Sequence, residues 1–379
     1  MDFRFTAEQE EFRGEVRSFI RAEFPKARDG ESFTKKLAEK GWLTMSWPKE
    51  HGGSGANHMR QLVYNEEMAY HRAPGQTMGT DRVGPTIILF GTAEQKATFL
   101  PKIVKDELNW CQGFSEPGSG SDLASLQTRA VKDGDSYIIN GQKIWTSGAQ
   151  RADYMILLAR TEPDAPKHRG ITYFLLDMKS PGVNVRPLVQ LNGLAGFNEV
   201  FFEDVRIPAE AVVGEVNRGW YVSTATLDFE RSGIGRVIGG LRTYEEIVEH
   251  AKTTPSRSAS GGMLFDELPI RHELADVGLG FRVGRLMSYR VAWMQSKQMI
   301  PNYEASMAKT FGTELHQRMA RVAVNSLGLA GQVLSGPGVV RDGLAPQTYM
   351  ASMSLTIAAG TSEINRNIIA QRGLGLPRG

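Results

Sequence analysis

The sequence Gly-Phe-Ser-Glu-Pro-Gly-Ser-Gly-Ser-Asp occupies residues 113–122 and places three glycines and three serines within ten residues. Because glycine leaves the backbone uncovered, N–H groups and hydroxyls in such a loop can closely approach a planar polar ligand or a phosphate. A second segment, Ala-Gly-Thr-Ser-Glu-Ile-Asn-Arg, lies far away in sequence at residues 359–366. The pair of segments is the first indication that distant parts of the chain share one ligand.

The residues after the glycine–serine segment have the pattern of β-structure. Following a Gly-Asp turn, the run YIINGQKIW at residues 137–145 predicts a hairpin across Asn140-Gly141, since Asn-Gly is a strong hairpin signal. The run ends in Trp145-Thr146-Ser147-Gly148, which places an aromatic ring beside a hydroxyl.

The chain divides into three parts by its sequence patterns. Residues 1–108 are predicted to be helical, beginning at a capping box in which Thr6 is the cap and Gln9 its partner. Residues 109–214 contain short strand patterns that indicate an antiparallel sandwich or barrel, and residues 215–379 return to long helical patterns. The predicted strands are residues 137–139, 154–158, 171–176, 183–188 and 199–205. We therefore expect an α+β fold with a helical N-terminal domain, a central β domain and a C-terminal helical bundle.

Composition narrows the class of protein. With 379 residues the chain is long enough for two or three domains, and its net charge of +2 argues against a nucleic-acid or membrane surface as main partner. The single cysteine, Cys111, excludes an intrachain disulfide and is expected to be a small buried residue. The polar residues after Met1 lack the pattern of a signal peptide, so we expect a cytoplasmic protein. The histidines show no metal-ligand spacing, and no metal site is predicted.

Three motifs in the right order give the chain its resemblance to a known family. Ser115–Asp122, Trp145–Gly148 and Gly360–Ile364 correspond to the flavin-binding signature, the tryptophan strand and the C-terminal signature of the acyl-CoA dehydrogenase family. Any one of these motifs alone would be weak, but three in order make a chance match improbable. The resemblance extends nearly from end to end and implies the same α, β, α arrangement, with a four-helix bundle at the C-terminus.

The resemblance implies FAD as cofactor and assigns residues to it. Trp145 is expected to lie against the isoalloxazine ring, Ser147 to bond near N5, and Ser115 to serve the pyrimidine end. Ser121 is expected to face the pyrophosphate. The equivalents of Thr361 and Glu363 bind the adenosine half or the ribityl chain in the family.

The resemblance also implies the reaction, the conversion of an acyl-CoA to a trans-2-enoyl-CoA. A carboxylate removes the α-proton while the β-hydrogen leaves as hydride, so the base needs a pocket dry enough to raise its pKa toward neutrality. Many members carry this Glu directly before the C-terminal Gly-Thr, where this chain has Ala359. A minority carry it on a helix of the C-terminal domain, just before an Arg.

Glu230 and Arg231 occupy that alternative position, within Leu-Asp-Phe-Glu-Arg at residues 227–231. We predict that Glu230 is the base, and that Arg231 and Ser121 contact the substrate. The backbone N–H of Ala359 is predicted to donate to the thioester carbonyl, which the substitution of Glu by Ala leaves in place.

One difference from the sequence pattern of the family leaves the oligomeric state open. The Arg-x-x-Phe-Gly segment that holds the FAD pyrophosphate across a subunit boundary is poorly matched by residues 256–265. Arg257 or Arg271 could substitute, or the group could come from another chain, so a homo-oligomer and a heterotetramer both stay open. An electron-transfer flavoprotein is the expected acceptor. The alternatives are an oxidase or monooxygenase of the same fold, a structural partner subunit, and a CoA-binding regulatory module; the identity of the acyl chain stays open.

Overall fold

The computed structural model describes residues 3–27, 30–228, 233–256 and 261–377. The chain forms two compact units, each assembled from more than one stretch of sequence. The helical unit comprises Met1–Arg28, Asn57–Gly75 and Arg231–Gly379, and the sheet unit comprises Asp29–Ala56 and Gln76–Glu230.

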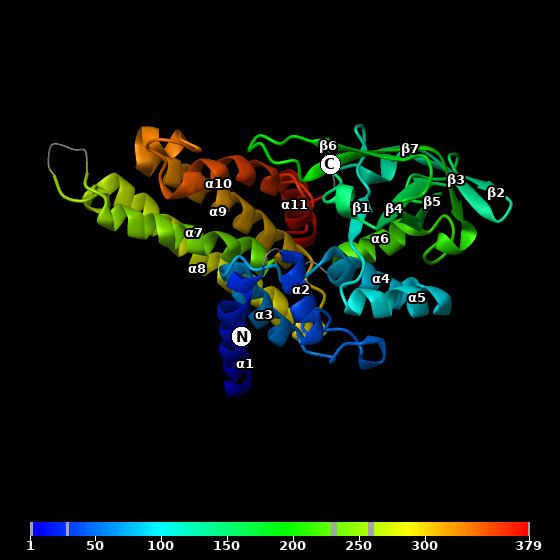
Figure 1. The fold of residues 1–379 in the computed structure, drawn as a ribbon, viewed down its shortest axis with the longest axis horizontal. Helices are drawn as coiled ribbons and strands as arrows, with labels where there is room; N and C mark the ends of the chain where they lie inside the picture. The colour runs from blue at the N-terminus through cyan, green and yellow to red at the C-terminus, as the bar shows by residue number, and fades with distance from the viewer. Residues whose placement is uncertain (1–2, 28–29, 229–232, 257–260, 378–379) are drawn as a thin grey trace. The chain divides into compact units, whose positions relative to one another are not determined.

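Long helices packed side by side make up the helical unit (Figure 1). Helices α7, α8 and α9 contact one another pairwise, α10 and α11 pack on α9, and α1 and α3 complete the unit through contacts of α3 with α7 and α8. The predicted capping box at the start of α1 is confirmed: the Thr6 hydroxyl accepts from the Gln9 N–H, and the Gln9 side chain accepts from the Thr6 N–H. The helices of this unit are α1 Ala7–Glu23, α3 His58–Tyr70, α7 Ile234–Thr253, α8 Leu268–Ser296, α9 Tyr303–Leu327, α10 Leu344–Ser352 and α11 Ser362–Ile368.

A single apolar core holds these helices together. Val237, Phe281 and Leu315, one each from α7, α8 and α9, belong to the same buried cluster. Small residues allow close approach of the helices, since a Cβ atom built on Gly284 would lie 3.1 Å from Val237. In the described part of the chain, no helix is long and apolar enough to span a membrane.

A seven-stranded sheet forms the centre of the sheet unit (Figure 1). Its path runs β1-β4-β2-β3-β7-β6, with β5 also paired to β4. Most pairings are antiparallel as predicted, but β1 and β2 run parallel to β4. The connection from β1 to β4 contains two further strands and is long enough to return the chain in the same direction. The strands are β1 Trp110–Gly113, β2 Arg129–Asp133, β3 Ser136–Lys143, β4 Tyr154–Arg160, β5 Ile171–Asp177, β6 Val183–Leu188 and β7 Phe197–Pro208.

Both faces of the sheet are covered at strands β4 and β5. Along β4, Ile156 and Leu158 belong to one buried cluster, whereas Met155 and Leu157 belong to another, as the alternation of a strand requires. The first cluster includes Ile87 of α4 and Leu100 of α5, so helices cover that face. The helices of this unit are α2 Gly30–Glu39, α4 Gly84–Phe90, α5 Ala93–Val104 and α6 Gly219–Asp228.

The predicted hairpin across Asn140-Gly141 is wrong. β3 continues through this dipeptide and pairs with β7 on both sides of it, with a register shift between Ile139 and Gly141. Gly141, at φ 147°, is part of a β-bulge rather than of a turn. The two-residue turn lies earlier, at Gly134-Asp135, where β2 turns back into β3. The five predicted strands are present, whereas β1 and β2 were not predicted.

Candidate functional site

The glycine–serine loop, residues 113–122, begins at the end of β1 in the sheet unit. A side chain would not fit at Gly113, because a Cβ atom there would lie 2.3 Å from the sulfur of Met155. The loop closes on itself: the N–H of Glu116 donates to the carbonyl of Ser119 at 2.9 Å, and the reverse bond measures 3.0 Å. The segment is therefore a fixed turn.

The serines of this loop differ in their surroundings. Ser119 is buried, and its hydroxyl donates to the carbonyl of Asp122 at 3.0 Å. Ser115 is half-buried and Ser121 is exposed. The two serines predicted from sequence to bind the cofactor are thus the two that reach the surface of the sheet unit.

A buried ion pair fastens the loop to strand β3. Lys143, the last residue of β3, is completely buried and donates from Nζ to the Glu116 carboxylate at 2.7 Å and to the Phe114 carbonyl at 3.0 Å. The Glu116 carboxylate also accepts the backbone N–H groups of Gln127 at 2.6 Å and Thr128 at 2.8 Å. Lys143 therefore holds two points of the loop at once.

Burial and charge act against each other in this pair. Burial lowers the pKa of Lys143 to about 8, although the Glu116 carboxylate acts to raise it. Burial acts to raise the pKa of Glu116, but the charge of Lys143 and the hydrogen bonds to the carboxylate outweigh it, and the pKa is lowered. Neither residue is assigned a role from sequence. The signal was present, because a lysine at an inward-facing strand position indicates a buried partner.

Trp145 lies two residues after Lys143 in sequence and has an unusual conformation. Its φ is 60°, in the left-handed region that bulky residues avoid, and it is 60% exposed. Its ring meets Phe197 edge to face, with 6.2 Å between ring centroids. The N–H of Ile144 donates to the carbonyl of Ser115 at 2.9 Å, so the Trp145 segment and the glycine–serine loop are directly joined.

The segment after Trp145 is held by β7. The N–H of Thr146 donates to the carbonyl of Asn198 at 3.0 Å, and the Asn198 side-chain amide donates back to the Thr146 carbonyl at 2.9 Å. The Thr146 hydroxyl is buried and finds no hydrogen-bond partner among the described residues. Ser147 is exposed. The sheet unit thus brings Ser115, Trp145 and Ser147 together.

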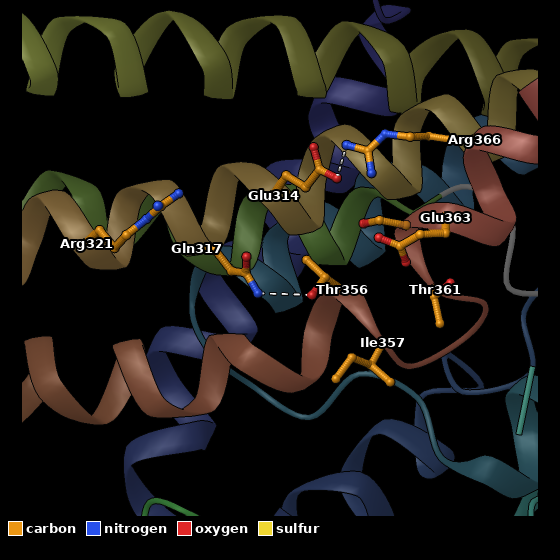
Figure 2. A pocket seen from close by; sticks show the side chains of 9 residues that line it. Glu314, Gln317, Arg321, Thr356, Ile357, Thr361, Glu363 and Arg366 are labelled. Carbon is orange, nitrogen blue, oxygen red and sulfur yellow. Dashed lines mark hydrogen bonds and ion pairs between the residues drawn. The ribbon is translucent and has the colours of Figure 1, made fainter.

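The helical unit contains a pocket between α9 on one side and, on the other, the C-terminal loop, residues 357–361, with the start of α11 (Figure 2). Two polar contacts cross it: Arg366 to the Glu314 carboxylate at 2.6 Å, and the Gln317 amide to the Thr356 hydroxyl at 3.0 Å. The residues that line it are Glu314, Gln317, Arg321, Thr356, Ile357, Thr361, Ser362, Glu363 and Arg366.

Thr361 and Glu363, both predicted to bind the cofactor, line this pocket. Thr361 caps α11 by accepting the N–H of Ile364 at 3.2 Å. The pKa of Glu363, which is exposed, is lowered by its own backbone N–H and by the Thr361 hydroxyl. The hydroxyl of the buried Ser362 finds no partner among the described residues.

Ala359 lies in the same loop and is also left-handed, with φ 54°. The carbonyl of the following Gly360 accepts from the Lys309 ammonium at 2.6 Å and from the Asn365 side chain at 2.9 Å. These bonds fix the peptide group between Gly360 and Thr361, two peptide groups after the one that carries the predicted N–H donor. Ala359 itself is exposed in the helical unit.

The remaining predicted residues divide into two groups. Glu230, Arg231 and Arg257 lie outside the described residues. Arg271 lies on α8, is exposed, and does not line the pocket of the helical unit. Cys111 is buried in β1, where burial raises the pKa of its thiol to about 12, so it has the predicted character of an inert residue. The described ranges contain no group of three or more His, Cys, Asp or Glu side chains that could hold a metal.

Comparison with known proteins agrees with the motifs. Three family models match successive parts of the chain: the acyl-CoA dehydrogenase N-terminal domain at residues 6–107, middle domain at 111–205 and C-terminal domain at 217–374. The chain is 38% identical to the acyl-CoA dehydrogenase IpdE1 of Mycobacterium tuberculosis, over 97% of this chain and 98% of that protein.

Two solved structures are similar over their whole length. A chain of the Tcur3481-Tcur3483 steroid ACAD superposes with a TM-score of 0.90 at 34% identity, with all of both chains covered. A chain of the ChsE4-ChsE5 complex from Mycobacterium tuberculosis gives a TM-score of 0.88 at 36% identity, again with complete coverage.

Proposed function

The chain belongs to the acyl-CoA dehydrogenase family, and from that premise we propose that Glu230 removes the α-proton of the acyl-CoA substrate. The chain is an FAD-dependent oxidoreductase that acts on a CH–CH pair of an acyl-CoA thioester. When bound, FAD would supply the acceptor for the β-hydrogen, which leaves as a hydride. The residues of this chain supply proton transfer, polarisation of the carbonyl and the surface for the flavin ring.

The choice of Glu230 as base is supported by the absence of a carboxylate at position 359 of the C-terminal loop. Ala359 stands where many relatives carry their base, so the carboxylate comes from elsewhere in the chain. Glu363 is a poor candidate, because its pKa is lowered and a catalytic base at neutral pH needs a raised one. Glu230, between the ends of α6 and α7, is the carboxylate that matches the alternative position in the family.

We propose that the N–H of Ala359 donates to the thioester carbonyl as enolate charge develops. A donor of this kind works only if its peptide group is fixed before the reaction. The bonds from Lys309 and Asn365 to the Gly360 carbonyl support this role, because they hold the loop two peptide groups after the donor.

The observation that carries the flavin assignment is the surface formed by Trp145. An indole that is 60% exposed, held at φ 60° and flanked by Ser115 and Ser147, suits a planar ring with polar edges. Thr361 and Glu363 would hold the adenosine half or ribityl chain.

A Glu230→Gln variant tests the proposed base. We expect it to keep FAD and to lose turnover with a dye acceptor by roughly 100- to 10,000-fold, the usual contribution of a positioned base. Glu363→Gln is the matched control, since it removes a carboxylate proposed to bind the cofactor and leaves the base in place. Near wild-type turnover of a yellow Glu230→Gln protein would contradict the assignment.

For the substrate, we propose a branched, cyclic or steroid-like acyl group. Ala359 is small where relatives carry a Glu, which leaves space near Cα, and one similar structure is described as a steroid ACAD. Relative kcat/KM for straight-chain, branched and steroid-side-chain CoA thioesters tests this. Preference for a straight chain would contradict it.

For the assembly, we propose a hetero-oligomer with a related subunit, working in the cytoplasm and passing electrons to an electron-transfer flavoprotein. Two observations support it: the poorly matched Arg-x-x-Phe-Gly segment, and the two chains named in both similar structures. The mass and FAD content of the chain purified alone test the proposal. A homotetramer with every site filled by FAD would remove its basis. Rapid reaction of the reduced protein with O₂ would favour an oxidase instead.

A further inference from the structure

The pair formed by Lys143 and Glu116 is not explained by stability alone. Removing both charges from water costs several kcal/mol per ion, and a buried ion pair is often no more stabilising than apolar residues of similar size. Lys143 is nevertheless completely buried, with its ammonium donating to Glu116 and to the Phe114 carbonyl. The contacts of the pair therefore call for a role beyond holding the fold together.

These contacts reach both segments of the surface proposed for the flavin ring, the glycine–serine loop and the Trp145 segment. In the loop, Phe114 and Glu116 flank Ser115 in sequence, so the bonds from Lys143 hold the loop on either side of that serine. In the other segment, Lys143 is two residues before Trp145. The Ile144 N–H donates to the Ser115 carbonyl and joins the two segments directly.

The conformation of Trp145 needs such support. A bulky residue at φ 60° is strained by roughly 1–3 kcal/mol and persists only where its surroundings enforce it. Contacts enforce it from both sides: Lys143 and Ile144 on the N-terminal side, and the two bonds between Thr146 and Asn198 on the C-terminal side. Without Lys143, one side of this constraint is lost.

We propose that Lys143 and Glu116 are positioning residues that hold Trp145 and Ser115 in the arrangement that receives the flavin ring. The inference rests on the proposed placement of the ring against Trp145. The pair acts through these two residues and is not required to touch the cofactor. Two charged groups face Lys143: Glu116 and, from β4, Arg160, whose guanidinium donates to the Ala124 and Leu126 carbonyls.

Titration of apoprotein with FAD, followed by quenching of flavin fluorescence, tests the proposal. We expect Lys143→Met to raise the FAD Kd by roughly 10- to 100-fold and to alter the flavin absorption band, because a buried charge loses its partner. The matched control is Lys167→Met, which removes an exposed pair with Asp122 on the same loop. We expect its Kd to stay within about 3-fold of wild type.

A double variant separates positioning from stability. Glu116→Gln/Lys143→Met leaves neither member of the pair as an unpaired buried charge, and Arg160 keeps its bonds to backbone carbonyls, so we expect resistance to urea to recover toward wild type while the FAD Kd stays raised. Recovery of FAD affinity together with stability would overturn the proposal, as would a Lys143→Met protein that binds FAD as wild type does.

Trp145→Leu distinguishes failure of this inference from failure of the proposed ring site. If Trp145→Leu changes the flavin spectrum and Kd while Lys143→Met does not, the ring site stands and the positioning role is overturned. If Trp145→Leu leaves both unchanged, the ring does not lie against Trp145 and the proposed function fails at that point.

Discussion

The Trp145 segment of the sheet unit, residues 144–148, and the C-terminal loop of the helical unit share a local arrangement in different surroundings. Each presents a left-handed residue other than glycine, Trp145 in one and Ala359 in the other, near a backbone carbonyl that accepts from a buried lysine. The neighbouring ion pairs differ. The Lys143–Glu116 side chains are 0% and 7% exposed, whereas Arg366 and Glu314 are 54% and 39% exposed.

The difference indicates where charge determines the geometry of the site. In water, the attraction between two charges is weak and is partly cancelled by the cost of ordering long side chains. In the interior, losing one partner leaves the other charge without solvation. We therefore expect the sheet unit to depend on its ion pair and the helical unit to depend mainly on backbone and cap hydrogen bonds.

Substitution of each cation by methionine should give the largest contrast. We expect Lys143→Met to lower the free energy of unfolding by about 3–5 kcal/mol, because Glu116 remains buried and unpaired. Arg366→Met should cost only roughly 0.2–1 kcal/mol, since that pair is half exposed. Urea unfolding of the two apoproteins measures both values. Equal losses would mean that burial does not distinguish the pairs.

Removal of a contact to FAD should also weaken FAD binding more in the sheet unit than in the helical unit. We expect Trp145→Leu to weaken FAD binding by roughly 10- to 100-fold, because an aromatic face and its fixed orientation are removed. Thr361→Ala should weaken it by about 3- to 10-fold, the value of one neutral hydrogen bond. FAD titration of both apoproteins is the measurement. A larger effect at Thr361 would reverse the comparison.

Acid should weaken the buried pair of the sheet unit. The pKa of Glu116 is lowered in the folded chain, so its contribution to stability is present above the ordinary value of 4.5 and is lost as pH falls through the folded value. We expect the difference in unfolding free energy between wild type and Glu116→Gln to shrink as pH falls below about 4.5.

Raising the pH above about 8 should increase the stability of wild type relative to Lys143→Met. Its folded pKa of about 8 lies below 10.5, so the unfolded chain binds more protons between these values. The stability of wild type relative to Lys143→Met should therefore rise between pH 8 and 10.5. A flat difference over this window would show that Lys143 does not titrate there.

The smallest effect is expected at Ala359. Glycine accepts φ 54° without strain, which relieves about 1–2 kcal/mol, but it loses roughly 0.5–1 kcal/mol more entropy on folding. Ala359→Gly should therefore be more stable by about 0.5 kcal/mol. It should also keep turnover, because the N–H donor remains. A 10-fold or greater loss of activity would mean that the methyl group, and not only the N–H, takes part.

Local signals in the sequence predicted much of the fold. The Thr6 capping box, the helix at α3 and five of the strands follow from residues within a few positions of one another. The Asn140-Gly141 hairpin failed because a neighbouring strand decides whether Asn-Gly turns or bulges. β7 pairs with β3 on both sides of this dipeptide, and the turn forms at Gly134-Asp135.

The residues of the candidate site stay predictions from sequence, and the contacts that support them were not predicted. Ser115, Trp145 and Ser147 come together as the motifs suggested, and Thr361 and Glu363 share a pocket. The inward-facing Lys143 indicates a buried partner, but that partner, Glu116, lies 27 residues away and no local pattern identifies it. The left-handed conformation of Trp145 could not be predicted from the sequence either, because bulky residues avoid this region of φ.

The measurement that tests the central claim most directly is the visible spectrum of the chain with its FAD, recorded anaerobically before and after addition of branched, cyclic and steroid-side-chain CoA thioesters. We predict that the flavin band bleaches with at least one of these thioesters and that the matching enoyl-CoA forms in equal amount. A yellow protein whose band no acyl-CoA thioester bleaches would contradict the account.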